Sequence, residues 1–348
     1  MFDRFLGKFS HDIGIDLGTT NTLVYVKNKG IVISEPSVAA INLRNNQIIA
    51  IGEEAHRMVG KTPGHIQISR PLVGGVISDF EVTEKIIKHF INKIHQQNFT
   101  FIPRPRVVIA IPLNITEVER KAVEDATKSA GAREVFLIEQ PIAAAIGARL
   151  PIQEPSGFMM VEIGGGATEI AVISLGGVVT SNSLHIAGGE LDENIIQYAR
   201  ENFNLLLGQR TAEEIKIKIG TVIGESEKQE SPLRGRDLIS GLPKEVMVSS
   251  FQIKEAMIRS VRQIVESIRD TLEKTPPELV ADIYERGIML SGGGANLRGL
   301  DKLIAQETRI PVHLVDDPLT AVVRGIGIVL EDIENLQEVL VPSANDEK

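Results

Sequence analysis

The sequence predicts an α/β protein built from two related halves, and three observations support this prediction. At 348 residues the chain is longer than one ordinary hydrophobic core, so two or more domains are expected. An apolar, strand-like segment that ends in an acidic residue and a glycine turn occurs twice, at Asp16 and again at Glu162. A third glycine turn, at 291–295, lies inside a strand–helix–strand pattern, the unit from which parallel sheets are made.

Composition narrows the class of protein. Apolar residues make up 43% of the chain and charged residues 24%, which is ordinary for a soluble globular protein. The net charge of −9 argues against a general nucleic-acid-binding protein, because phosphate binding needs clustered Lys and Arg. The absence of Cys excludes disulfides and thiolate metal sites and fits a cytoplasmic location, where thiols stay reduced. No apolar run reaches the roughly 20 residues that a transmembrane helix needs.

Residues 1–10 predict an amphipathic membrane-binding segment. Four apolar side chains recur at helical spacing and share one face, with Arg4 and Lys8 beside it. The segment is too short for a signal peptide. We therefore expect it to lie in the membrane interface; the alternative is a helix docked on the protein's own surface. The apolar residues are Phe2, Phe5, Leu6 and Phe9.

The two acidic–glycine segments have the same order of predicted elements. Residues 12–33 predict a strand, a glycine turn, a strand, a second turn and a third strand, and residues 159–180 repeat this order. Gly18 in the first copy corresponds to Gly164 in the second. Glycines let backbone N–H groups approach phosphate oxygens closely. In both copies β-branched residues follow the glycines, whereas a helix follows them in Rossmann and Walker A sites, so we exclude those two kinds of site.

In the rest of the first half, one apolar segment and one strand end are candidates for function. Segment 98–103, with Phe101 and Ile102, is either a second membrane contact or a segment buried in a cleft. Gln140 follows a predicted strand and precedes an alanine-rich helix, and such strand ends are where α/β proteins place their chemistry. Helices are predicted over 82–96, over 116–130 with Thr116 as N-cap, and over 142–150.

The second half contains further candidates for ligand contact. A helical pattern over 211–219 places Glu213 and Lys216 on one face, which indicates either a ligand contact or an ordinary exposed ion pair. The third glycine turn is expected to lead directly into a helix over 297–307, whose N-terminus suits the ribose or phosphate end of a nucleotide. The remaining predictions are helices over 192–202 and 252–274, a small β excursion over 221–248, and close helix packing at Gly325 and Gly327.

Collected together, these motifs resemble the actin/sugar-kinase/DnaK-type ATPase superfamily and, within it, the MreB family of bacterial actins. One glycine motif alone is weak support, but five motifs in this order and at these separations are specific. The resemblance extends from Phe2 to about Glu331. The five segments are Asp16–Asn21, Gln140–Gly147, Glu162–Glu169, Ser291–Ala295 and Asp317–Gly325.

The resemblance implies an actin-like fold, in which two related α/β domains hold a nucleotide in the cleft between them and each carries a smaller inserted subdomain. The implied bounds are 11–155 plus 325–340 for the first domain (insert about 41–84), 156–324 for the second (insert about 190–251), and 341–348 for a disordered tail.

The resemblance also implies which residues bind ATP and Mg²⁺. Asp16 would face the metal ion through water, because Mg²⁺ keeps most of its hydration shell, and Gln140, Asp16 and Glu162 would be the catalytic residues. The phosphate-binding residues would be Gly18, Thr19, Thr20 and Asn21 on one side and Gly164, Gly165, Gly166 and Ala167 on the other. The adenosine-binding residues would be Glu213, Glu214, Ile215, Lys216, Gly292, Gly293, Gly294, Ala295 and Asn296.

Three positions depart from the usual pattern of that family. Gln140, Glu162 and Ala167 stand where relatives usually carry Glu, Asp and Thr. Actin itself resembles this chain at two of them, with Gln at the water-positioning place and an aliphatic residue at the third. Because phosphoryl transfer relies mainly on positioning and electrostatics, a Gln that orients water can suffice. We therefore expect nucleotide binding with slow ATP hydrolysis.

The function that the resemblance implies is a membrane-associated cytoskeletal ATPase whose paired filaments organise cell-wall synthesis in rod-shaped cells. Its implied partners are further copies of itself, the inner face of the cytoplasmic membrane, RodZ, MreC and MreD. A small-molecule kinase of the same superfamily is the alternative, but it would need a substrate pocket with a catalytic Asp in the first half, and the sequence offers no convincing one. A DnaK-type chaperone would need a substrate-binding β domain, for which a chain ending at Lys348 leaves no room.

Overall fold

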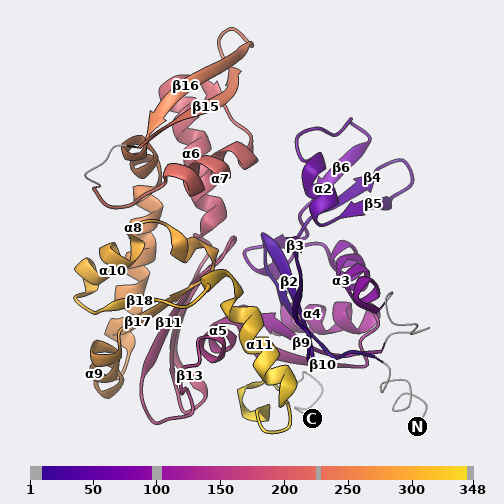
Figure 1. Ribbon diagram of the computed structural model, residues 1–348, viewed down its shortest axis with the longest axis vertical. Coiled ribbons are helices and arrows are strands. Elements are labelled where there is room, and N and C mark those ends of the chain that lie inside the picture. The colour runs from indigo at the N-terminus through magenta and orange to yellow at the C-terminus, as the bar shows by residue number, and fades with distance from the viewer. Residues whose placement is uncertain (1–9, 96–103, 225–228, 343–348) are drawn as a thin grey trace. The chain divides into compact units, whose positions relative to one another are not determined.

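The computed structural model describes residues 10–95, 104–224 and 229–342 (Figure 1). The chain divides into two compact units, residues 1–156, 173–178 and 319–348 in the first and residues 157–172 and 179–318 in the second. Across the described residues, none of the helices combines the length and the apolar character that crossing a bilayer requires. The predicted membrane contacts Phe2, Phe5, Leu6, Phe9, Phe101 and Ile102 lie outside the described residues, as does segment 343–348 of the predicted tail.

A five-stranded sheet in the order β10-β9-β1-β2-β3 forms the centre of the first unit. β1, β9 and β10 run parallel, whereas β2 and β3 are antiparallel to their neighbours. β1 and β9 are rich in Ile and Val and almost entirely buried, as expected of strands covered on both faces. The strands are β1 (Ile13–Leu17), β2 (Asn21–Val26), β3 (Gly30–Pro36), β9 (Arg106–Ile111) and β10 (Glu134–Glu139).

The second five-stranded sheet has the same arrangement. Its order is β13-β12-β11-β17-β18, so each acidic–glycine hairpin is flanked by a third strand on one side and by two parallel strands on the other. The turn before the third strand also matches, because Asn28 and Leu175 both have positive φ angles, 63° and 51°. The strands are β11 (Phe158–Ile163), β12 (Thr168–Ser174), β13 (Gly177–Leu184), β17 (Ile288–Ser291) and β18 (Val312–Leu314).

Each unit carries a small additional sheet. In the first unit, β5-β4-β6 packs with α2 around a few buried Ala and Val side chains, and β7 and β8 form a separate hairpin. In the second unit, β14, β15 and β16 form a small sheet, whose last two strands correspond to the predicted β excursion over 221–248, whereas β14 lies before it. The elements are β4 (Ala39–Asn42), β5 (Gln47–Ile51), α2 (Glu53–Met58), β6 (Ile66–Ser69), β7 (Leu72–Val73), β8 (Val76–Ile77), β14 (Leu205–Leu206), β15 (Glu230–Asp237) and β16 (Pro243–Ser249).

The helices of the first unit confirm the predicted cap at Thr116 and the predicted close helix packing at Gly325, whereas Gly327 packs against Tyr25 of β2. Thr116 caps α4, since its side chain accepts the Glu119 N–H and the Glu119 carboxylate in turn accepts the Thr116 N–H. α5 and α11 cross at Gly147 and Gly325, where an added Cβ would lie only 1.9 and 1.7 Å from backbone oxygens of the facing helix. The helices are α3 (Phe80–His95), α4 (Glu117–Ser129), α5 (Gln140–Gly147) and α11 (Ala321–Glu331), with short 3₁₀ turns η3 (Pro318–Thr320) and η4 (Gln337–Val339).

The helices of the second unit share one hydrophobic core with its sheet, and one expectation about them is wrong. The third glycine turn does not lead directly into a helix, because Leu297 has an extended backbone and Gly299 a left-handed one. The last two glycines form part of a 3₁₀ turn instead, and the helix begins three residues later than predicted. The helices are α6 (Gly188–Phe203), α7 (Gln209–Ile219), α8 (Ser250–Lys274), α9 (Pro277–Arg286), η2 (Gly293–Asn296) and α10 (Leu300–Thr308).

His95 joins the end of α3 to the start of β1. Its Nδ1 lies 2.8 Å from the Ile91 carbonyl oxygen, and its Nε2 lies 3.1 Å from the His11 N–H nitrogen. The two bonds together require a neutral ring that donates from Nδ1 and accepts at Nε2. Burial lowers the pKa of His95 below its usual value of 6.5.

A pH-dependent loss of stability should follow from His95. The unfolded chain binds a proton at pH values where the folded protein does not, so the free energy of unfolding falls as the pH drops below 6.5. We expect His95→Gln, whose amide can donate and accept, to reduce this slope between about pH 5 and 6.5. Urea unfolding at several pH values measures the slope, with exposed His313→Gln as the control. Identical slopes in wild type and His95→Gln would contradict the prediction.

Candidate functional site

The first glycine loop follows β1. Asp16 is 9% exposed, and burial raises the pKa of its carboxyl to about 7. One backbone hydrogen bond closes the loop, from the Gly18 N–H to the Asn21 carbonyl oxygen at 3.1 Å. A Cβ on Gly18 would lie 2.7 Å from that oxygen, so the turn requires Gly. The loop therefore places a buried carboxyl beside a tight backbone turn, as the sequence predicts.

Two hydrogen bonds from distant residues hold this loop, and the sequence pattern did not predict either of them. The Ser37 hydroxyl donates to the Gly18 carbonyl oxygen at 2.5 Å and also bonds the Thr22 hydroxyl at 2.8 Å. The Gly75 N–H donates to Thr19 Oγ1 at 2.9 Å. These partners lie 19 and 56 residues away in the chain, and no local motif marks them. The loop is thus fixed from two distant segments of its own unit.

Gln140 is the first residue of α5 and lies directly after β10. Because β1, β9 and β10 are parallel, the strand ends that carry Asp16 and Gln140 lie at the same edge of the sheet. The Gln140 side chain is buried, with 9% of the residue exposed. Glu139 precedes it, and burial raises the pKa of this carboxyl above its usual value. The sequence pattern assigned no separate role to Glu139, whose titratable carboxyl lies next in the chain to the uncharged amide of Gln140.

The second glycine loop repeats the first, 146 positions later. Its closing bond runs from the Gly164 N–H to the Ala167 carbonyl oxygen at 3.0 Å, the counterpart of the Gly18–Asn21 bond. Glu162 is 8% exposed and Ala167 is 7% exposed, so both predicted residues are buried. The same loop conformation therefore follows the same kind of strand in both units.

The N-terminus of α6 fixes the backbone direction of this second loop. The Gly188 N–H donates to the Gly164 carbonyl oxygen at 3.1 Å, and the Gly189 N–H donates to the Gly165 carbonyl oxygen at 2.8 Å. In a trans peptide group the N–H points away from the carbonyl oxygen. The N–H groups of Gly165 and Gly166 therefore point away from α6. Such consecutive backbone donors form the kind of concave surface that binds phosphate oxygens.

The third glycine segment packs directly against β11, the strand that carries Glu162. A Cβ on Gly292 would lie 2.5 Å from Glu162 Oε1, and a Cβ on Gly294 would lie 2.4 Å from an Ile side chain of β11. The glycines are therefore needed for close approach as well as for backbone freedom. Of the other predicted residues in this segment, Ala295 is buried and Gly293 and Asn296 are exposed.

Lys216 on α7 makes contacts that the sequence pattern did not predict. Its ammonium group donates to the Gly188 carbonyl oxygen at 2.7 Å and lies 2.8 Å from Asp192 Oδ1. The Lys216 side chain is 14% exposed, so it is a buried partner of α6 rather than an exposed partner of Glu213. The other predicted α7 residues are Glu213, which is partly exposed, Glu214, which pairs with Arg210 at 2.9 Å, and Ile215, which belongs to the core.

The predicted site residues thus form two groups, one in each unit. The first unit brings Asp16, loop 18–21 and Gln140 to one sheet edge, and the second brings Glu162, loop 164–167 and segment 292–296 together. Within the described part of the chain, no group of three or more His, Cys, Asp or Glu side chains could hold a metal ion on its own.

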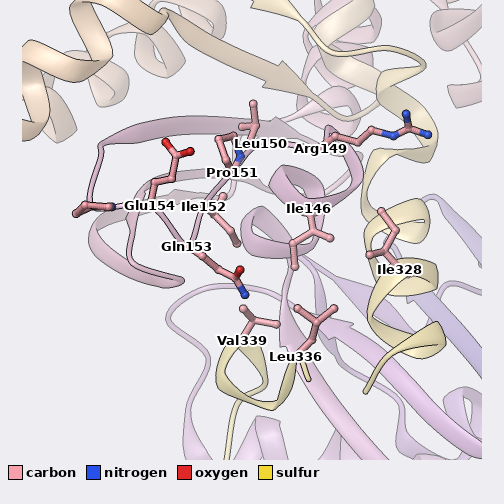
Figure 2. Close-up of a pocket in the computed structure, with 11 residues that line it drawn as sticks. Ile146, Arg149, Leu150, Pro151, Ile152, Gln153, Glu154, Ile328, Leu336 and Val339 are labelled. Atoms are coloured by element: carbon pink, nitrogen blue, oxygen red, sulfur yellow. The ribbon is translucent and has the colours of Figure 1, made fainter. Parts of the chain in front are cut away.

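A separate pocket of about 720 Å³ lies in the first unit (Figure 2). Its mostly apolar wall comes from the end of α5 and the segment after it, and from α11 and the residues that follow α11. None of the predicted site residues lines this pocket. The lining residues are Ile146, Arg149, Leu150, Pro151, Ile152, Gln153, Glu154, Pro155, Ile328, Leu336 and Val339.

Comparisons with known proteins agree with the fold. The sequence model of the family described as MreB/Mbl protein matches residues 10–338. The cell shape-determining protein MreB of Escherichia coli strain K12 is 50% identical over 338 residues, which cover 96% of this chain and 97% of that protein. The crystal structure of MreB5 of Spiroplasma citri bound to ADP has a TM-score of 0.88 at 38% identity and covers 94% of this chain and 99% of its own. Its structure bound to AMPPNP has a TM-score of 0.89.

The fold extends to a more distant protein. The MamK double helical filament structure has a TM-score of 0.78 at 23% identity, a likeness that establishes the fold alone. The duplicated sheet, the two glycine loops and the match over nearly the whole chain all agree with the resemblance found in the sequence. The chain therefore belongs to the MreB/Mbl family of cell shape-determining, actin-like proteins.

Proposed function

We propose that this chain is a cytoskeletal ATPase that binds Mg-ATP, assembles into actin-like filaments on the inner face of the cytoplasmic membrane, and organises cell-wall synthesis to maintain rod shape. The main support is the duplicated loop, closed by the Gly18–Asn21 bond in one unit and the Gly164–Ala167 bond in the other. Its relatives add support, since the two MreB5 structures hold ADP or AMPPNP and MamK is described as a double helical filament. RodZ, MreC and MreD are the proposed links to cell-wall synthesis.

The nucleotide would be bound by both units. Loop 18–21 supplies backbone and hydroxyl donors to the phosphates, and loop 164–167 supplies the backbone N–H groups that point away from α6. The exposed residues Gly293 and Asn296 meet the adenosine. A ligand that both units hold couples them, so loss of the γ-phosphate changes the equilibrium between conformations that assemble and conformations that do not.

The two buried carboxyls fit Mg²⁺. Asp16 and Glu162 each lie one residue before the end of a strand that leads into a glycine loop, and Mg²⁺ prefers carboxylate and phosphate oxygens together with water. When bound, the ion would neutralise charge that develops on the β- and γ-phosphates. Glu162 is one methylene longer than the Asp usual in the family, so its carboxylate reaches further from the strand.

ATP hydrolysis should be slow and should depend on Gln140. An amide orients the attacking water but does not accept its proton at neutral pH. We expect Gln140→Ala to reduce phosphate release from Mg-ATP roughly 100-fold, and Gln140→Glu, which supplies a base, to raise it above the wild-type rate. Phosphate release at saturating Mg-ATP measures both effects. A wild-type rate no higher than that of Gln140→Ala would contradict hydrolysis at this site.

Sedimentation with and without Mg-ATP and anionic liposomes tests the assembly and membrane parts of the proposal. Nucleotide-dependent pelleting is expected, and deletion of residues 2–9 should abolish liposome binding while assembly in solution persists. Many weak anchors on one filament give an avidity that a single anchor lacks. Unchanged liposome binding after the deletion would either place the anchor in segment 99–102, which contains Phe101 and Ile102, or contradict a membrane anchor in residues 2–9. A monomer that phosphorylates an added metabolite would favour the kinase alternative.

A further inference from the structure

We propose that Lys216 is a positioning residue for the phosphate loop 164–167, and that it acts through the peptide group between Gly188 and Gly189. The inference rests on the proposed nucleotide-binding function and deepens it. It gives Lys216 a role different from the adenosine contact that the family resemblance implies.

The peptide group between Gly188 and Gly189 is hydrogen-bonded at both ends. Lys216 Nζ donates to its carbonyl oxygen, which belongs to Gly188, at 2.7 Å. Its N–H, which belongs to Gly189, donates to the Gly165 carbonyl oxygen at 2.8 Å. Because a peptide group is planar, its two ends cannot turn independently. Lys216 therefore acts together with the first turn of α6 to hold the direction of the bond to Gly165.

The charge on Lys216 also strengthens that bond. An ammonium group at the carbonyl oxygen polarises the peptide group, which makes the N–H at the other end a better donor. The Lys216 side chain is 14% exposed and the Asp192 side chain 7%, so water screens the interaction weakly. Asp192 lies on α6 one turn after Gly188 and 2.8 Å from the ammonium group. Asp192 thereby holds the charge over the first turn of α6.

The loop depends on this outside support because it has no side chains at 164–166. Three consecutive glycines leave its backbone free to adopt other conformations. α6 approaches the loop closely through its own first two residues, which are also Gly, and a Cβ on Gly189 would lie 3.0 Å from the Gly165 oxygen, which is tighter than most side-chain contacts. Without Lys216, the peptide group between Gly165 and Gly166 can turn, and the Gly166 N–H loses its direction. Phosphate binding should suffer from this change and adenosine binding should not.

Affinity as a function of phosphate number tests the inference. Calorimetric titration of the full chain with AMP, Mg-ADP and Mg-AMPPNP gives three dissociation constants for each variant. We expect Lys216→Met to bind AMP within about twofold of wild type but Mg-AMPPNP about tenfold more weakly, the loss expected for one hydrogen bond to a charged group. Lys218→Met, on the exposed surface of the same helix, is the matched control and should bind all three like wild type.

The pairing with Asp192 gives a second test. Asp192→Asn should weaken Mg-AMPPNP more than AMP, and the double variant should be no weaker than Lys216→Met, because the two groups act as one unit. The double variant leaves neither charge buried alone, so it replaces Lys216→Met if that variant fails to fold. An equal loss of affinity for all three nucleotides would mean that Lys216 contacts the adenosine directly or serves folding in general. That result would overturn this inference but leave the proposed function intact. A wild-type chain that binds none of them would overturn the proposed function and this inference together.

Discussion

Replacing Gly325 by Ala should destabilise the first unit severely. A Cβ at this position would lie 1.7 Å from the Ala143 carbonyl oxygen and 2.6 Å from its carbon. The clash is with backbone atoms, so no side-chain rotation relieves it, and α5 and α11 must move apart. Overpacking of this kind costs about 3 kcal/mol, which lowers the melting temperature of a unit of this size by roughly 6 to 12 °C. Since α5 begins at Gln140, the same movement should disturb the candidate catalytic residue.

Calorimetry of the nucleotide-free protein measures this effect. Gly64→Ala is the matched control, because a Cβ there has no other heavy atom within 4 Å. Gly147→Ala, on the opposite helix of the same crossing, should reproduce the loss, since its Cβ would lie 1.9 Å from the Ala321 oxygen. A melting temperature for Gly325→Ala equal to that of Gly64→Ala would contradict the close crossing of α5 and α11.

Asp16→Asn should weaken the Mg²⁺-dependent part of nucleotide binding and yet stabilise the nucleotide-free protein at pH 8. Burial raises the pKa of this carboxyl from 3.8 to about 7. Between these values the folded protein holds a proton that the unfolded chain has lost, so the contribution of Asp16 to stability falls as the pH rises from 3.8 to about 7 and stays low above it. An amide has no charge to desolvate and avoids this loss.

Two measurements separate these effects. Urea unfolding should give similar stabilities for Asp16→Asn and wild type near pH 4 and a higher stability for the variant at pH 8. The affinity for AMPPNP with Mg²⁺ should exceed that with EDTA in wild type, and we expect this advantage to shrink about 10- to 100-fold in Asp16→Asn. Asp125→Asn, on the exposed surface of α4, is the control. An unchanged Mg²⁺ effect would contradict the metal role, and a lower stability at pH 8 would contradict the cost of burying the charge.

Features that depend on a few neighbouring residues could be predicted from the sequence. The turns at Gly18 and Gly164 follow from glycines placed directly after an apolar strand, and each closes with one bond across three residues. The cap at Thr116 is likewise a pattern of four residues. Gly325 was identified because a Gly within a helix usually has a packing reason.

Contacts between distant segments could not be predicted, because the fold alone decides which groups meet. Nothing near Ser37 or Gly75 in the sequence points to the first loop that both support. Lys216 is the clearest example. Its spacing from Glu213 indicated either a ligand contact or an exposed ion pair, but Asp192 on the neighbouring helix is a buried partner whose charge water screens far less.

The packing of Gly292 has a consequence for how the chain can change during evolution. Gly292 cannot become Ala whatever residue stands at 162, because its Cβ would lie 2.4 Å from the Ile163 carbonyl oxygen. The missing side chain of Gly292 also leaves room for the Glu162 carboxylate. Its Oε1 lies 2.5 Å from the position that a Cβ on residue 292 would take. Replacing Glu162 by the shorter Asp would therefore not make room for a side chain at 292, because the clash with the Ile163 backbone would remain.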